Sequence, residues 1–461
     1  MRTHNKVKKH QSKITLKENL GYGIGDFASN LIYASISAFI TYFYTDIVGG
    51  ISAGIIGTIM FASRILDGFT DIGMGIITDK TKSKHGKART WIFWLTIPFA
   101  LSTILVFTVP DLNLIGKIIY IVVTYNLFNL IYTGINVPYG VLNSLITRHQ
   151  FSRSMLNIYR MACAVIGTVL VTGLTIPITN LFGGSQRGWI ITYVFYSVIS
   201  MLAFFITFKT TKERVRQPKR KKDVPLHQGF KALFRNKYWI ILVMFLIVSF
   251  TLIGLASAIN VYYAHIILKD SSLVGVLGVA LNIPQLLGLF LMPKLIAHVG
   301  KRNTMIIGII ISLLGSIPMI IDPTSITFIV IGLFVRGLGF ASVVGSQFAM
   351  IADTIEYGEW KTGIRTEGLT YSAGSFGTKA GNGLAIALVG WILSLTHYSG
   401  GSSHQPDTAA AGICFMFIYL PIILSIIQII LLLFYKVDKI YPRIINDLLK
   451  RREKWKVKNP S

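Results

Sequence analysis

Long apolar segments, separated by short polar ones, run through the whole chain. Twelve of them reach about 20 residues or more, the length that an α-helix needs to cross the hydrocarbon core of a bilayer. The pattern therefore predicts an all-α polytopic membrane protein with twelve transmembrane helices. The predicted spans are 18–46, 53–78, 91–110, 117–146, 154–180, 189–208, 238–267, 273–297, 303–321, 325–355, 367–396 and 410–436.

The longest polar stretch, residues 209–237, follows the sixth span and divides the spans into six and six. A basic linker between two six-span halves is typical of the major facilitator fold, whose halves are related by internal repetition. We therefore expect two pseudo-symmetric six-helix bundles. The expected parts are a basic N-terminal tail (1–17), a first bundle (18–208), the linker (209–237), a second bundle (238–436) and a basic C-terminal tail (437–461).

The composition agrees with a membrane protein and excludes two other classes. Hydrophobic residues make up 52% of the 461 residues and charged residues only 14%, with a mean hydropathy of +0.60. An ordinary soluble domain carries about 25% charged residues, and a disordered chain has far less apolar surface. The two cysteines, Cys163 and Cys414, lie inside apolar segments, which supports neither a disulfide framework nor a zinc site.

The net charge of +26 is distributed in a way that predicts orientation. If the N-terminal tail faces the cytoplasm, 38 of the 45 Lys and Arg lie in segments on that side, three lie on the opposite side and four lie inside spans. This asymmetry predicts a multi-pass protein of the cell membrane with both termini in the cytoplasm, and it argues against nucleic acid as a partner. Because the first apolar segment is too long for a signal peptide and no small-residue cleavage site follows it, we expect it to be a retained span.

Polar residues in the first span lie on one helix face. They are spaced by three or four residues and include a carboxylate, which costs about 2.5–3.5 kcal/mol at the centre of a membrane. A helix-packing face could use the same small and polar residues, but the carboxylate favours the lining of a cavity. The stripe consists of Tyr22, Asp26, Asn30, Tyr33 and Ser37, with Ser29 beside it.

The second span places Arg64, Asp67 and Asp71 on one face, at positions i, i+3 and i+7. Two carboxylates one turn apart repel each other when both are ionised in a low-dielectric site, so the pair favours a proton or a cation between them. Oxygen ligands suit a hard cation such as Na⁺. The alternative is a structural Arg–Asp pair, with the second Asp near the lipid headgroups.

Three further spans carry polar residues that could face a ligand. An uncharged face of amides and hydroxyls on the fourth span suits a neutral, hydroxyl-rich molecule, although hydrogen bonds between helices are an alternative. Lys379 could neutralise the Asp pair of the second span or bind the substrate. The residues are Asn126, Asn129, Thr133, Asn136, Gly140 and Asn143 on the fourth span, Arg160 on the fifth, and Tyr371, Ser375, Lys379 and Asn382 on the eleventh. The sequence contains no metal-ligand spacing, nucleophile elbow or phosphate loop, so we expect neither an enzyme nor a structural metal.

Four segments together resemble one family of transporters. They are GIGDFASN in the first span, SRILDGFTDIGMGIITDKTKSKHGKARTWI across the second, YTGINVPYGVL in the fourth and ADTIEYGEWKTGIRTEGLTYS after the tenth. Together they resemble the glycoside–pentoside–hexuronide:cation symporters, the melibiose permease-like group of the major facilitator superfamily. The resemblance extends from about residue 18 to residue 440.

The resemblance implies a secondary transporter that couples sugar uptake to the inward flow of H⁺, Na⁺ or Li⁺ and needs no other cofactor. The positions that match the family's cation site are Asp67, Asp71 and Thr133, with Thr70 where the family has Asn. The positions that match its sugar site are Asp26, Arg160 and Lys379. The polar stripes add Tyr22, Tyr33, Asn136 and Ser375 as candidates for this sugar site. Arg64 and Lys379 are the expected charge partners of the acids.

Two departures bear on the substrate. Asn136 replaces a sugar-binding Asp of the family, and Gly140 replaces a Trp one turn later. The pattern NVPYG resembles the pentoside and glucuronide branch, so that a neutral xyloside and an anionic hexuronide both remain open. A sugar sensor without net flux and a lysolipid transporter are the alternative functions. We expect a monomer in the lipid bilayer that works by alternating access around a site near the midplane.

Overall fold

The computed structural model describes residues 14–147, 150–215, 231–364, 367–402 and 404–458, which form helices and connecting loops. The first part of the chain contains α2 (Leu16–Tyr42) with the π-helical turn η2 (Phe43–Ile47), α3 (Ala53–Lys80), α4 (Arg89–Phe107), α5 (Leu114–Ile146), α6 (Gln150–Leu181) and α7 (Gln186–Thr210). The second part contains α9 (Lys237–Tyr262) with η3 (Tyr263–Ile267), η4 (Ser271–Leu273), α10 (Val274–Leu289), α11 (Met292–Val299), α12 (Lys301–Leu314), α13 (Ser316–Ile321), α14 (Ile326–Thr362), α15 (Glu367–Leu395), α16 (Asp407–Cys414) with η5 (Phe415–Tyr419), α17 (Leu420–Phe434) and α18 (Val437–Lys458).

The helices group into two compact units. The first unit comprises Met1–Ile51 and Phe69–Lys219, and the second comprises Ser52–Gly68 and Arg220–Ser461. The division after Lys219 falls inside the segment that the sequence predicts as a linker. One difference from the predicted domains concerns α3, whose first part, up to Gly68, groups with the second unit, while the rest groups with the first.

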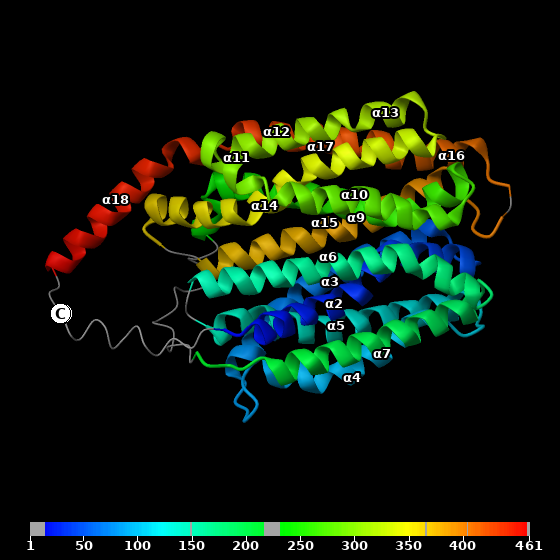
Figure 1. Ribbon diagram of the computed structural model, residues 1–461, viewed down its shortest axis with the longest axis horizontal. Coiled ribbons are helices and arrows are strands. Elements are labelled where there is room, and N and C mark those ends of the chain that lie inside the picture. Colours follow the sequence, from blue (N-terminus) through cyan, green and yellow to red (C-terminus); the bar gives the residue numbers. More distant parts are fainter. Residues whose placement is uncertain (1–13, 148–149, 216–230, 365–366, 403, 459–461) are drawn as a thin grey trace. The chain divides into compact units, whose positions relative to one another are not determined.

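In the first unit α2 packs against α6 and α7, and α4 packs against α5 and α7 (Figure 1). Aromatic side chains fill one end of this bundle: the ring of Phe43 lies 4.9 Å from Phe107 and 5.5 Å from Trp189. The close approach of α2 and α6 depends on Gly23, because a Cβ at this position would lie 2.8 Å from the carbonyl oxygen of Tyr159. Packing through glycine is common between membrane helices.

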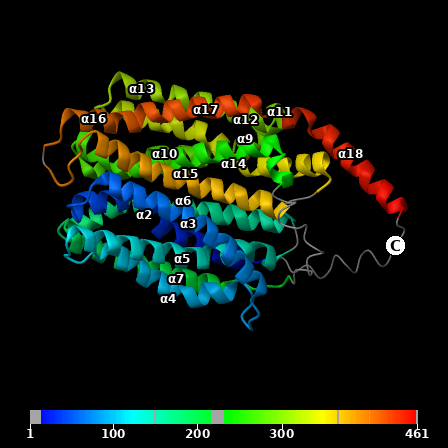
Figure 2. The same cartoon turned by 180° about the vertical axis from the view of Figure 1, so that it is seen from behind.

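In the second unit α15 packs along α9, while α10 and α12 pack along α14 (Figure 2). A buried apolar core joins α9, α12, α14 and α17, and includes Phe245, Met305, Val343 and Leu432. The helix α18 extends this core at one end with Ile444 and Leu448. The sequence predicts a basic C-terminal tail over residues 437–461. In the structure, apolar residues at a spacing of four form one face of a helix, which packs on the second unit.

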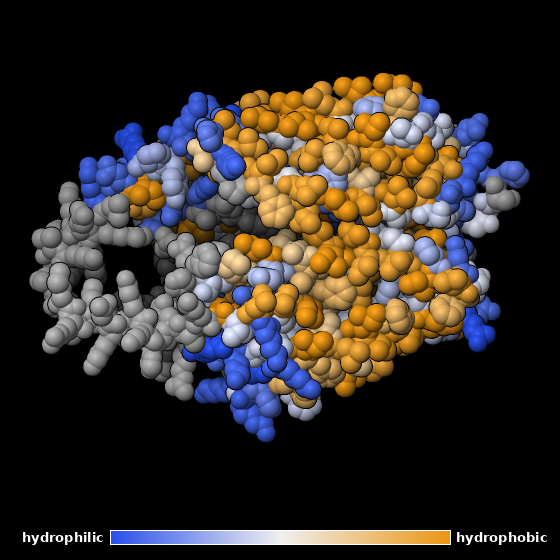
Figure 3. Space-filling model, in the orientation of Figure 1, coloured by the Kyte–Doolittle hydropathy of each residue, from blue (hydrophilic) through white to orange (hydrophobic). Residues whose placement is uncertain are grey.

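Ten helical segments within the described part of the chain are long and apolar enough to cross a membrane. Their outward side chains are apolar, as Leu101, Ile115, Phe195 and Ile426 illustrate, and Figure 3 shows such residues along the sides of the helices with polar ones at the ends. A soluble protein would not expose so much apolar surface. The ten do not include α2 and α3. Charged residues, namely Asp26 in α2 and Arg64, Asp67 and Asp71 in α3, lower the mean hydropathy of these two helices. Each predicted span corresponds to a helix or a series of helices, which confirms the all-α polytopic fold.

The same helix-capping device occurs in each unit. In the first, the carboxylate of Glu213, just after α7, accepts hydrogen bonds from the backbone N–H groups of Lys87, Ala88 and Arg89 at the start of α4, at 2.8, 2.9 and 3.0 Å. In the second, the carboxylate of Asp438, just after α17, accepts one from the N–H of Arg302 near the start of α12, at 2.9 Å. A carboxylate at a helix N-terminus satisfies orphan donors and complements the helix dipole.

Candidate functional site

A buried ion pair joins α2 and α6 in the first unit. The Nε of Arg160 lies 3.2 Å from Oδ2 of Asp26, and its Nη2 lies 3.4 Å from Oδ1. The Asp26 side chain is 8% exposed, whereas that of Arg160 is 29% exposed. The pair therefore satisfies the carboxylate inside the helix bundle but leaves part of the guanidinium accessible to a further partner.

Tyrosine rings from α2 and α5 surround this ion pair. The rings of Tyr22 and Tyr139 stack with centroids 4.8 Å apart, and the guanidinium of Arg160 lies 5.2 Å from the centroid of Tyr139. Each hydroxyl donates a hydrogen bond to the backbone carbonyl of the other tyrosine, at 3.4 Å from Tyr22 and 2.5 Å from Tyr139. These reciprocal bonds fix both rings beside Asp26.

A second stacked pair lies further along the same two helices. The rings of Tyr33 and Tyr132 have centroids 4.9 Å apart and an interplanar angle of 17°. Ser29 donates a hydrogen bond of 3.5 Å to the hydroxyl of Tyr132. Aromatic faces held in this way can pack against the apolar face of a sugar ring or against each other.

Between the two tyrosines of α5, one face of the helix is polar and uncrowded. Asn136 is half-buried, and a Cβ built on Gly140, one turn later, would meet no atom within 4 Å. On the same helix the hydroxyl of Thr133 donates a hydrogen bond of 3.0 Å to Oδ1 of Asp71 on α3. The helix α5 thus carries a half-buried amide, an uncrowded glycine one turn later and a hydroxyl that contacts a carboxylate.

The second unit contains a separate cluster of charges on α3 and α15. The Nζ of Lys379 lies 2.9 Å from Oδ2 of Asp67, and Nη1 of Arg64 lies 3.6 Å from the same oxygen. The side chains of Arg64 and Asp67 are fully buried, and that of Lys379 is 14% exposed. Gly383 allows this approach, because a Cβ there would lie 2.7 Å from Cβ of Arg64.

The residues predicted from the sequence are thus found in three groups. Asp26, Arg160 and Tyr22 come together, Thr133 meets Asp71, and Arg64 and Lys379 meet Asp67. On α3, Asp71 accepts a hydrogen bond from a hydroxyl, and Asp67 lies near two cations. Thr70 is half-buried on α3. Ser375 lies on α15, but its side chain lies outside the described part of the chain.

Two functional candidates are absent from the sequence-based prediction, namely Tyr132 and Tyr139. They lie seven residues apart on the polar face of α5, on either side of Asn136. A spacing of seven residues places both tyrosines on the same helix face as Asn136 and could have indicated a binding site. Tyrosines in membrane helices also take part in packing contacts, so the spacing alone does not distinguish the two roles. Only the stacking on Tyr22 and Tyr33 distinguishes them.

The donor set determines what these groups can bind. Among the described residues, no three His, Cys, Asp or Glu side chains come together as a multivalent metal would need. The oxygens of Asp71 and Thr133 are candidate ligands for a monovalent cation or, in the case of the carboxylate, a proton. The ion pair of Asp26 and Arg160 offers hydrogen-bond acceptors and donors together, which a molecule rich in hydroxyl groups requires.

The amino-acid sequence of this chain is similar to those of known membrane transporters. Residues 21–439 match the family described as "MFS/sugar transport protein". The chain is 34% identical over 446 residues to the isoprimeverose transporter of Lactiplantibacillus pentosus, covering 95% of this chain and 92% of that protein. It is 30% identical over 448 residues to the putative glycoside/cation symporter YagG of Escherichia coli K12, covering 96% of both.

Solved structures share the fold at lower identity. The crystal structure of a mutant of the nucleoside transporter NupG matches 90% of this chain and 99% of its own, with a TM-score of 0.68 and 15% sequence identity. A likeness at this level of identity concerns the fold alone. It agrees with the major facilitator fold that the span pattern predicts.

Proposed function

The chain belongs to the MFS/sugar transport protein family of membrane transporters, and on this premise we propose that it carries a glycoside into the cell together with H⁺ or Na⁺. It is a transporter and not an enzyme. The relatives named as an isoprimeverose transporter and a putative glycoside/cation symporter support a glycoside as the substrate class. The proposed mechanism is alternating access, in which the substrate site opens first to one side of the membrane and then to the other.

The observation that carries the proposal is the buried ion pair of Asp26 and Arg160 beside stacked tyrosines. The carboxylate accepts hydrogen bonds from sugar hydroxyls, and the guanidinium donates them; such charge-assisted bonds are roughly twice as strong as neutral ones. Tyr33 is half-buried and contributes an aromatic face, whereas Tyr22 is fully buried and stacks on Tyr139 beside Arg160. Asn136, half-buried on α5, adds an uncharged donor and acceptor for sugar hydroxyls.

We propose that the coupling cation binds on α3 and α5 of the first unit. The carboxylate of Asp71 and the hydroxyl of Thr133 supply two oxygens 3.0 Å apart, and Thr70 lies next to Asp71 in the chain. Asp67, on the part of α3 that groups with the second unit, is a second acid that we propose as a ligand of the coupling cation. A proton or cation that binds Asp67 would compete with the ammonium of Lys379 for Oδ2 of this carboxylate.

The energetics of a single cation are sufficient for uptake. One positive charge that moves inward gains about 2.3 kcal/mol per 100 mV of membrane potential. A tenfold accumulation of a neutral glycoside costs about 1.4 kcal/mol. One cation per glycoside therefore drives accumulation even without an ion gradient, provided that binding of the two is coupled.

We propose that the protein lies in the plasma membrane with both termini in the cytoplasm. The basic linker and the basic residues of α18 support this orientation through the positive-inside rule. The bilayer is then the partner of the apolar outer surface. We propose a monomer as the functional form, because both capped units are contained in one chain.

The test is transport in proteoliposomes that contain only the purified protein. We expect counterflow of isoprimeverose in vesicles preloaded with this sugar, and accumulation above the external concentration when an inward Na⁺ or H⁺ gradient is imposed. Accumulation under one gradient and not under the other identifies the cation. Counterflow without accumulation under either gradient would refute coupling, and absence of counterflow with a panel of glycosides would refute glycoside transport itself.

A further inference from the structure

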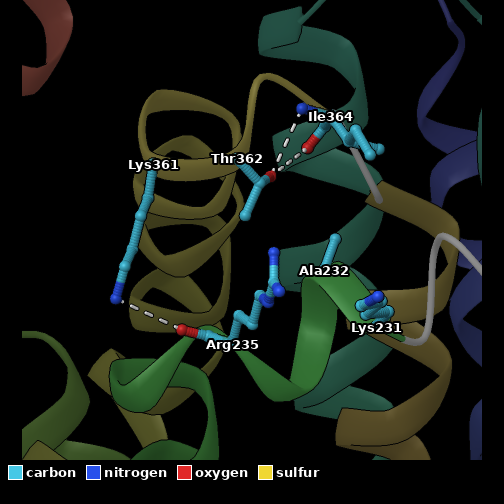
Figure 4. Close-up of a pocket in the computed structure, with 6 residues that line it drawn as sticks. All are labelled: Lys231, Ala232, Arg235, Lys361, Thr362 and Ile364. Atoms are coloured by element: carbon cyan, nitrogen blue, oxygen red, sulfur yellow. Dashed lines mark hydrogen bonds between the residues drawn. The ribbon is translucent and has the colours of Figure 1, made fainter.

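A basic cavity lies in the second unit and shares no lining residue with the groups described so far. Its volume is about 660 Å³, and its lining among the described residues consists of Lys231, Ala232, Arg235, Lys361, Thr362 and Ile364 (Figure 4). Residues 231–234 form a short helical segment before α9, and the other side comes from the end of α14 and the residues after it. All of these residues lie outside the apolar spans Lys237–Ile267 and Ile326–Gln347.

Three of the lining side chains are cations, and none of the described lining residues is an acid. Lys231 and Arg235 are four residues apart, and both are exposed. Like charges at this spacing repel each other across a helical turn. An anion between them would relieve that repulsion. Figure 4 shows the guanidinium of Arg235 extending from its helical turn toward Thr362.

One hydrogen bond connects the two sides of the cavity, and two others shape the side formed by α14. The Nζ of Lys361 donates to the backbone carbonyl of Arg235 at 3.4 Å, which ties α14 to the turn before α9. The hydroxyl of Thr362 donates to the carbonyl of Gly358 at 2.7 Å, and the N–H of Ile364 donates to that hydroxyl at 3.3 Å. The cation-bearing elements are therefore held to each other and do not simply share a loose surface.

Compensation of helix dipoles is the simpler explanation of these cations, since α14 ends at Thr362. A helix C-terminus is equivalent to about half a negative charge. The end of α14 and the end of the short turn together offset about one of the three positive charges. A net positive charge therefore remains among the described lining residues, and a bound anion would compensate it.

We propose that this cavity binds a phosphate-bearing anion. Arg235 supplies a planar fork of donors that suits two phosphate oxygens, and the lysines supply point charges. A phospholipid headgroup and a soluble phosphate compound share this chemistry, and the position beyond the ends of the spans is accessible to both. The cavity shares no residue with the proposed glycoside site, and we expect its occupant to stabilise the protein.

The test uses the full-length protein in nanodiscs and a double variant, Lys231→Gln with Arg235→Gln. One arm titrates protein in phosphatidylcholine nanodiscs with inorganic pyrophosphate by calorimetry, with sodium chloride at matched ionic strength as the reference. The other compares thermal unfolding in phosphatidylcholine nanodiscs with that in nanodiscs containing phosphatidylglycerol. We expect wild-type protein to respond saturably in one arm, and the double variant to bind at least tenfold more weakly or to lose the rise in Tm.

The chain offers a matched control for this variant. Lys439 and Arg443 are also exposed, four residues apart and in the second unit, but on α18. The variant Lys439→Gln with Arg443→Gln removes the same charge and should respond like wild type. A response to pyrophosphate identifies a soluble phosphate, and one to phosphatidylglycerol identifies a headgroup. No response in either arm, or an equal loss in both double variants, would overturn the proposal; if the double variant does not fold, Arg235→Gln alone is tested in its place.

Discussion

The ammonium of Lys379 lies 2.9 Å from the carboxylate of Asp67, and Arg64 approaches the same oxygen to 3.6 Å. Removal of one partner from a buried ion pair costs about 3–5 kcal/mol, because it leaves an uncompensated charge. We expect Asp67→Asn to lower Tm more than Lys379→Gln, since the carboxylate contacts two cations. Thermal unfolding of the purified variants in detergent measures this difference.

The double variant Asp67→Asn with Lys379→Gln tests whether the two residues act as a pair. Residues in direct contact commonly show coupling energies of about 0.5–3 kcal/mol. We therefore expect the double variant to be more stable than the sum of the two single losses predicts. Strict additivity would show that the 2.9 Å contact contributes nothing to stability.

Thr133 tests the proposed cation site without removal of a charge. Thr133→Val deletes the hydroxyl that donates to Asp71 and preserves the shape of the side chain. The variant removes one of the two oxygens of the proposed Na⁺ site, so we expect the Na⁺ concentration for half-maximal uptake to rise about tenfold, which corresponds to about 1.4 kcal/mol. Counterflow of glycoside, which needs no cation gradient, should change less.

Thr133→Ser is the control for that variant, because it keeps the hydroxyl. We expect its cation dependence to match that of wild type within about threefold. If Thr133→Val also retains the wild-type cation dependence in proteoliposomes, the hydroxyl is not a ligand and serves only to pack α5 against α3.

The fold could be predicted largely from the sequence, because crossing a bilayer imposes a length and a composition on each helix. For the acids, the sequence and the family resemblance indicate the partners Thr133, Arg64 and Lys379 but not which acid each of them contacts. Asp67 and Asp71 occur four residues apart on one helix face, which predicts a shared proton or cation. In the structure Asp71 meets a hydroxyl of α5 and Asp67 meets an ammonium of α15, so the partner of each acid depends on how these helices pack against α3. Packing of this kind is not encoded in spacing along one helix.

The helix α18 shows a second limit of the sequence analysis. Its high content of Lys and Arg resembles an orientation signal, and this pattern obscures the apolar positions Ile440, Ile444 and Leu448. Those positions bury against the second unit, and Asp447 accepts a hydrogen bond of 3.0 Å from Trp360 of α14. The partner surface that stabilises the helix lies about 90 residues earlier in the chain, beyond the reach of a local pattern.

Arg160 tests the proposed recognition of glycosides. Its guanidinium contacts both oxygens of Asp26 and lies over the ring of Tyr139, a geometry that a lysine ammonium cannot reproduce. We expect Arg160→Lys to weaken isoprimeverose binding by about tenfold or more, with little change in Tm, because the positive charge remains beside Asp26. Binding is measured by calorimetry and stability by thermal unfolding. Wild-type affinity in this variant would exclude Arg160 from the glycoside site.

Two glycines in membrane helices should respond in opposite ways to alanine. A Cβ at Gly383 would lie 2.7 Å from Cβ of Arg64, so Gly383→Ala must move α15 or α3; overpacking of this kind costs about 1–3 kcal/mol. A Cβ at Gly140 meets no atom within 4 Å, and Gly140→Ala should be neutral or stabilise α5 by up to about 1 kcal/mol. Thermal unfolding compares the two variants. A destabilised Gly140→Ala would show that this face of α5 is packed and cannot border a glycoside.

The repeated helix caps give a prediction that compares the two units. Glu213 accepts three backbone hydrogen bonds at the start of α4, whereas Asp438 accepts one near the start of α12. Loss of a side-chain cap typically costs about 0.5–2 kcal/mol, so we expect Glu213→Ala to reach the upper end of that range and to exceed Asp438→Ala. Glu213→Gln keeps one acceptor oxygen and should fall between Glu213→Ala and wild type. Because all three changes lie outside the proposed sites, the affinity for isoprimeverose should stay unchanged while Tm falls. Equal losses from the two alanine variants would mean that the number of capping bonds does not determine the stability of these helix ends.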